Sequence, residues 1–161
     1  MAPQISPTIG HYTIPPWDLP PSLYFVEHGQ SQACRNGNGD FEAADLWSPL
    51  RGPLHLHERV SQHVNWANRN PSPFISTFAD YRHALNWAWQ RRRPIRIYEI
   101  DTSSLDDDYP WVFYASDFTR NCFESEFLFL HTIPGHAIAG TTYVGPPARI
   151  NRQTQRPRGY C

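Results

Sequence analysis

Proline is the residue that most restricts what this chain can fold into. Sixteen prolines occur in 161 residues, and six of them lie within the first 21 residues. Proline lacks a backbone N–H and interrupts both helices and central strands. A bundle of long helices is therefore excluded, and the spacing predicts short strands joined by turns. We expect residues 1–21 to form an extended, proline-rich arm.

The rest of the composition is that of one globular domain. Hydrophobic residues make up 40% of the chain, and the formal net charge is −1. That fraction suffices for a core, and the charge argues against nucleic acid as the partner. No apolar run approaches the roughly 20 residues of a membrane span, so no membrane segment is expected. The start shows no signal-peptide pattern, and both cytosolic action and secretion stay open.

Hydrophobic periodicity predicts an α+β domain over residues 22–145, followed by a polar, arginine-rich tail over 146–161. Apolar spacing predicts a helix over 54–68 and a second helix that Asp80 caps. Runs of apolar and β-branched residues predict mostly antiparallel strands. These strands are expected over 23–26, 74–78, 95–101, 111–114, 124–131 and 137–144.

Three short segments follow one another in a suggestive order. They are Leu23–Val26, then Ser72–Thr77 opening into a helix, then Glu124-Ser-Glu126 before an apolar strand and Ile133-Pro134. In this order the chain resembles the ADP-ribosyltransferases of the cholera-toxin group, and it is similar to a fungal enterotoxin-like domain family. The resemblance covers most of the chain. It implies an ADP-ribosyltransferase-like fold in which two small, mostly antiparallel sheets form a cleft for NAD⁺.

The resemblance also implies an activity, NAD-dependent mono-ADP-ribosyl transfer or NAD⁺ hydrolysis. Glu126 would stabilise the oxocarbenium-like ribose, as a carboxylate does in glycoside hydrolysis. Ser76 would orient Glu126 and the cofactor. Glu124 lies two residues before Glu126, so on a strand both side chains share one face. By resemblance, Glu124 would help to activate an acceptor, expected to be an arginine of a protein.

The resemblance places Tyr24, Phe25, Ser76 and Thr77 at the cofactor. At position 25 the family has an arginine that binds a phosphate, and this chain has phenylalanine. We expect that an arginine at position 25 would raise the affinity for NAD⁺. The same departure supports an alternative, a catalytically impaired relative that works by binding a protein or nucleic-acid partner.

Histidines and arginines outside these segments suggest weaker hypotheses. His55, His57 and His63 resemble a metal-binding spacing, but side chains two apart on a helix diverge, so no metal site is expected. Arg91–Arg93 and Arg96 are interpreted as a solvated helix end, with phosphate contact as the alternative.

Two further features concern cysteine and lysine. Cys34, Cys122 and Cys161 are an odd, small set that leaves room for one disulfide. All fourteen basic residues are arginine, and lysine is absent. An arginine-rich coding bias is one explanation of this absence, and selection against ubiquitination in a cytosol is the alternative hypothesis.

Overall fold

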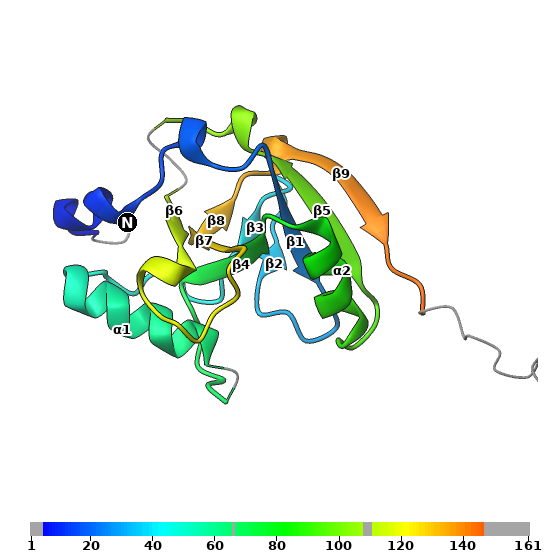
Figure 1. Ribbon diagram of the computed structural model, residues 1–161, viewed down its shortest axis with the longest axis horizontal. Helices are drawn as coiled ribbons and strands as arrows, with labels where there is room; N and C mark the ends of the chain where they lie inside the picture. The colour runs from blue at the N-terminus through cyan, green and yellow to red at the C-terminus, as the bar shows by residue number, and fades with distance from the viewer. Residues whose placement is uncertain (1–4, 66, 108–110, 147–161) are drawn as a thin grey trace, which may run out of the picture.

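The computed structural model describes residues 5–65, 67–107 and 111–146 (Figure 1). It contains a six-stranded sheet, a three-stranded sheet and two α-helices, and all paired strands within the sheets are antiparallel. The predicted α+β class with antiparallel sheets is therefore confirmed. The two-residue strands of the small sheet were not predicted from the sequence.

The strand order of the large sheet is β6-β7-β4-β1-β5-β9, and that of the small sheet is β2-β3-β8. The bounds of the large sheet are β1 Ser22–Glu27, β4 Phe74–Phe78, β5 Arg96–Asp101, β6 Val112–Tyr114, β7 Glu126–Leu130 and β9 Ile138–Tyr143. The bounds of the other elements are β2 Cys34–Arg35, β3 Phe41–Glu42, β8 Thr132–Ile133, α1 Pro53–Val64 and α2 Tyr81–Trp89.

Alternation along β4 separates two faces of the large sheet. Phe74 and Phe78 belong to clusters that contain residues of α1 and α2, respectively. Ile75 belongs to the core that also contains Phe41 of the small sheet. Successive side chains of a strand point to opposite faces. Ser76 therefore lies on the helix-covered face, between the two helices.

The large sheet is weakly joined in its middle. Within the described strands, β1 and β4 pair at Tyr24 and Phe78, whereas β1 and β5 pair over six positions. No further residue pair joins the described strands β1 and β4. The halves β6-β7-β4 and β1-β5-β9 therefore separate next to Ser76, which opens space there.

The two helices begin and end for identifiable reasons. Pro53 occupies the first turn of α1, and the helix ends at Val64 because Asn65 is extended. The predicted end at residue 68 was too late. Asp80 caps α2 as predicted, since its side chain accepts hydrogen bonds from the backbone of Arg82 and His83.

The N-terminal segment differs from the extended arm that was predicted. Pro7–Tyr12 and Pro16–Asp18 form 3₁₀-helices, and Figure 1 shows the first of them beside α1. Ile9 is fully buried in the cluster beneath α1, and that burial fixes the segment. Of the predicted tail, residues 147–161 lie outside the described residues.

Candidate functional site

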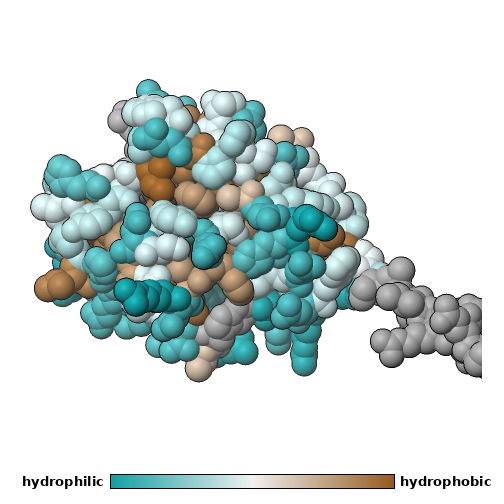
Figure 2. All heavy atoms as spheres, viewed as in Figure 1, coloured by the Kyte–Doolittle hydropathy of each residue, from teal (hydrophilic) through white to brown (hydrophobic). Residues whose placement is uncertain are grey.

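A cleft of about 250 Å³ opens where β1 and β4 separate. Its lining comes from β1 and the loop that follows it, β4, the last turns of α1 and the following loop, the end of α2 with Arg91, and Asn121, Phe123 and Glu126. Figure 2 shows hydrophilic side chains over most of the visible face, with hydrophobic side chains between them. The cleft combines aromatic walls with polar groups, which is typical of a small-molecule site.

Glu126 is a buried carboxylate at the start of β7, with 6% of its surface exposed. Ser76 Oγ donates a hydrogen bond of 2.6 Å to Oε1, and the backbone N–H of Phe123 donates one of 3.3 Å to Oε2. Burial raises the pKa of Glu126, although both hydrogen bonds and the nearby His83 act in the opposite direction. Such a carboxylate is a candidate for chemistry because its environment perturbs it.

His63 extends this contact into a chain of hydrogen bonds. Its Nε2 lies 2.8 Å from Ser76 Oγ, and its Nδ1 lies 2.6 Å from Ser72 Oγ. Ser76 has one hydroxyl proton, which it donates to Glu126, so Nε2 must donate to Ser76 and Nδ1 must accept from Ser72. Burial, and secondarily Arg59, lowers the pKa of His63 to about 4, so the ring is neutral at pH 7.

Replacement of His63 by glutamine should make the protein less sensitive to acid. The pKa of His63 rises from about 4 in the folded protein to its ordinary 6.5 on unfolding. Between these pH values the unfolded chain therefore binds more protons than the folded protein. Stability is then lost as the pH falls from 6.5 towards 4. Urea unfolding at pH 7 and pH 4.5 should show that wild type loses about 2 kcal/mol more of its free energy of unfolding than the variant does.

The matched control is His11→Gln, because His11 is exposed. This variant should lose as much stability in acid as wild type does. Equal acid losses in wild type and His63→Gln would show that His63 is not held neutral by the fold.

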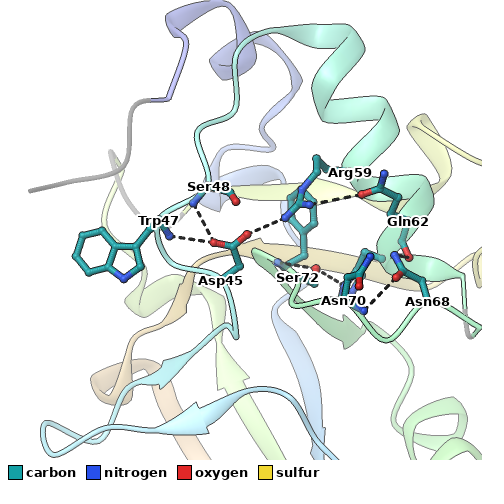
Figure 3. A network of polar contacts seen from close by, with 10 residues as sticks. Asp45, Trp47, Ser48, Arg59, Gln62, Asn68, Asn70 and Ser72 are labelled. Atoms are coloured by element: carbon teal, nitrogen blue, oxygen red, sulfur yellow. Dashed lines mark hydrogen bonds and ion pairs between the residues drawn. The ribbon is translucent and has the colours of Figure 1, made fainter.

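Arg59 is anchored beside this chain by Asp45, and Figure 3 shows the network. Arg59 Nη2 lies 2.9 Å from Asp45 Oδ2, while the backbone N–H groups of Trp47 and Ser48 donate to Oδ1. Burial alone would raise the pKa of Asp45, but the hydrogen bonds from Ser48 and Trp47, together with Arg59, lower it. The ion pair therefore fixes a positive charge near His63.

Two of the three predicted catalytic residues meet in the cleft. Ser76 and Glu126 are in contact, whereas Glu124 is exposed in the turn before β7 and does not border the cleft. The backbone N–H of Glu126 donates to the carbonyl of Phe123, which closes this turn. β7 therefore begins at Glu126, and the predicted shared strand face of Glu124 and Glu126 was wrong.

Three of the predicted cofactor residues are committed to packing. Phe25 borders the cleft, but its ring is 5% exposed and packs against Phe41 at 4.8 Å. Tyr24 packs against Tyr81, and Thr77 is fully buried and donates to a backbone carbonyl of β7. Neither Tyr24 nor Thr77 lines the cleft. The expected gain in NAD⁺ affinity from arginine at position 25 has no support in this packing.

Sequence reasoning missed the roles of His63, His83 and Phe123. A signal for His63 was present in the sequence. His63 follows Leu56 by seven residues and Val60 by three, and this helical spacing is that of a residue on the buried face of α1. His83 Nδ1 lies 2.8 Å from Ser125 Oγ, and its ring lies 4.4 Å from that of Phe123. Nothing in the spacing of these last residues indicated that they meet beside Glu126.

The remaining sequence hypotheses concern metals, thiols and membranes. Cys34 and Cys122 are free thiols, and Cys161 lies outside the described residues. In the part of the chain that the structure describes, no group of three or more potential ligands could hold a metal ion. Within the same residues, no helix has the length and apolar character needed to traverse a bilayer.

Comparison with known proteins gives one match. A family model described as a domain of unknown function (DUF7587) matches residues 18–145, well over half of the chain. The chain belongs to the DUF7587 family. No curated protein and no solved structure matches it. The DUF7587 match includes all the strands of both sheets and both α-helices, and therefore every residue of the cleft described above.

Proposed function

We propose that this domain cleaves the nicotinamide–ribose bond of NAD⁺, as an ADP-ribosyltransferase or NAD glycohydrolase with an ADP-ribosyltransferase-like fold. The observation that carries the proposal is the hydrogen bond of 2.6 Å between Ser76 and the buried carboxylate of Glu126 inside a cleft. The order of the sequence segments around these two residues supports the same activity.

The chemistry requires one well-placed negative charge. When the C1′–N bond breaks, its electron pair leaves with nicotinamide, which becomes neutral, and positive charge develops on the ribose. The ionised carboxylate of Glu126 would stabilise that charge, and the low local dielectric strengthens the interaction. Water then adds to C1′ and releases one proton, or a protein nucleophile replaces water. An arginine acceptor rests on the resemblance alone, because Glu124 lies outside the cleft.

The charges around the cleft also suit NAD⁺. Among the described residues that line it, Glu126 has the sole carboxylate, whereas Arg59, Arg69 and Arg91 are cationic. NAD⁺ carries a positive ring at one end and a diphosphate in its middle. Its cationic ring matches Glu126, and its anionic part matches the arginines.

The buried ring of Phe25 favours a second candidate function. With phenylalanine in place of the family's arginine, the chain could be a catalytically impaired relative that binds a protein partner. The two candidates differ in one measurement, the release of nicotinamide from NAD⁺ by wild type. Calorimetry on the same sample shows whether NAD⁺ binds. Binding with release supports the enzyme, and no binding at millimolar NAD⁺ supports the binding module.

Replacement of Ser76 by alanine should slow nicotinamide release roughly tenfold, since a hydrogen bond to a charged group is lost. It should also move the acid side of the pH–rate profile to higher pH. The Ser76 hydrogen bond lowers the pKa of Glu126, so its removal raises that pKa, and a higher pH is needed to ionise the carboxylate. Initial rates measured over a pH series check both effects.

The matched control is Ser31→Ala, because Ser31 borders the same cleft and bonds to the backbone of His28. The acid side of the pH–rate profile of Ser31→Ala should coincide with that of wild type. An unchanged acid limb in Ser76→Ala would separate Ser76 from the ionisation of Glu126.

A further inference from the structure

The arginine cluster after α2 separates into different roles in the structure. Arg93 donates to the carbonyl of Val144, and Arg96 pairs with Glu27 at 3.1 Å. Arg92 is exposed. Arg91 differs from these residues because it lines the cleft that contains Glu126.

Arg91 is held in place by an aromatic ring. It follows Trp87 by four residues, and the centre of its guanidinium lies 4.0 Å from the centroid of the Trp87 ring. The ring of Trp87 also contacts His28, whose ring centroid lies 5.3 Å away. Stacking on an indole restrains the planar guanidinium, so less conformational entropy is lost when it binds a ligand.

Arg91 and Glu126 belong to one continuous wall. Phe78 is the partner of Glu126 across β4 and β7, and its ring lies 5.8 Å from that of Trp87. The guanidinium of Arg91 stacks on the Trp87 ring. An aromatic surface therefore connects the negative end of the cleft to a positive end.

The cationic and titratable side chains that line the cleft differ in their surroundings. Arg59 is paired with Asp45, and Arg69 is exposed. Burial, and secondarily Arg91 itself, lowers the pKa of His28, so that ring is neutral at pH 7. Arginine keeps its charge in proteins even where burial lowers its pKa.

We propose that Arg91, stacked on Trp87, binds the diphosphate of the nucleotide and so supplies from the segment after α2 the cation that Phe25 cannot supply from β1. This inference rests on the proposed function, since it takes the ligand to be NAD⁺ or ADP-ribose. The planar guanidinium can donate two parallel hydrogen bonds to phosphate oxygens, which a lysine cannot do.

The test uses ADP-ribose, which has the diphosphate but no nicotinamide, in calorimetric titrations of the full chain. Arg91→Gln should weaken ADP-ribose binding by about 10- to 100-fold, the loss expected for hydrogen bonds between charged groups. Arg92→Gln is the matched control and should bind within about twofold of wild type. Arg91→Lys keeps the positive charge but not the planar guanidinium, so its affinity for ADP-ribose should lie between those of wild type and Arg91→Gln.

A phosphate-free substrate separates this proposal from the proposed function. Nicotinamide riboside has the scissile bond but no phosphate, so Arg91→Gln should slow nicotinamide release from NAD⁺ far more than release from nicotinamide riboside. A cooperative thermal unfolding transition shows that the variant is folded. If Arg91→Gln fails to fold, Arg91→Lys carries the test, with reduced ADP-ribose affinity as the supporting result.

Two results would overturn the proposal: equal ADP-ribose affinity in wild type and both Arg91 variants, or no ADP-ribose binding by wild type at millimolar concentration. If wild type releases no nicotinamide while ADP-ribose binding still depends on Arg91, the phosphate site stands and the proposed catalysis fails. If wild type releases nicotinamide but ADP-ribose binding is the same in wild type and the Arg91 variants, the proposed catalysis stands and the phosphate site at Arg91 fails.

Discussion

Glu126→Gln should reduce nicotinamide release from NAD⁺ by at least about 100-fold, the effect typical of losing one preorganised charge-stabilising group. Glutamine has nearly the same shape, and its carbonyl oxygen can still accept the hydrogen bond from Ser76. It lacks the negative charge that the developing oxocarbenium ion requires. Single-turnover release assays at saturating NAD⁺ measure this loss in the chemical step, apart from any change in binding.

The free energy of unfolding of Glu126→Gln is expected to equal or slightly exceed that of wild type at neutral pH. Burial raises the pKa of Glu126 in the folded protein, so the folded state binds more protons than the unfolded state just above the ordinary glutamate range. Stability is therefore lost as the pH rises through that window, and the variant escapes this cost. Glu58→Gln removes an equal charge from an exposed position of α1 and should keep full activity. Undiminished turnover by Glu126→Gln would remove Glu126 from the mechanism.

Phe25→Arg should destabilise the domain by about 4 kcal/mol or more, because it removes a core ring and buries a charge. The Phe25 ring packs between the small sheet and β5, against Phe41 and Tyr98. The guanidinium of Arg35 already lies 5.6 Å from the Phe41 ring centroid, so a second cation would be repelled there. Thermal unfolding should show a Tm lower by about 10 °C or more, or no cooperative transition.

Thr141→Arg provides the comparison for Phe25→Arg, since Thr141 is exposed on the edge strand β9. This variant should unfold within a few degrees of wild type, about the effect of an ordinary surface change. A stable Phe25→Arg protein with tighter NAD⁺ binding would show instead that side chains at position 25 can turn into the cleft.

Local patterns predicted the parts of the fold that local physics decides. Asp80 was recognised as a cap because a carboxylate before a helix bonds to its first N–H groups. The strands holding Ser76 and Glu126 were recognised from short apolar runs. The contact between these two residues was expected from the family resemblance, because pairing of distant strands depends on tertiary packing.

The failures arose where distant segments decide the outcome. Glu124 was placed on a strand, but a turn hydrogen bond between Glu126 and Phe123 starts β7 later. The ring of Phe25 faces a small sheet that includes two-residue strands, too short for periodicity to reveal. Arg91 reaches the cleft because α2, which it follows, packs beside β1 and β4, and no spacing rule distinguishes Arg91 from Arg92.

The buried N-terminal segment has a practical consequence for defining this domain. The family match begins at residue 18, yet Ile9 fills the space beneath α1 and the backbone N–H of Ser6 donates to Leu50. A fragment cut to the matched boundaries would leave α1 without this support, and α1 carries His63. The unit that folds therefore extends upstream of the unit that sequence similarity delimits, and an expression fragment should start before residue 5.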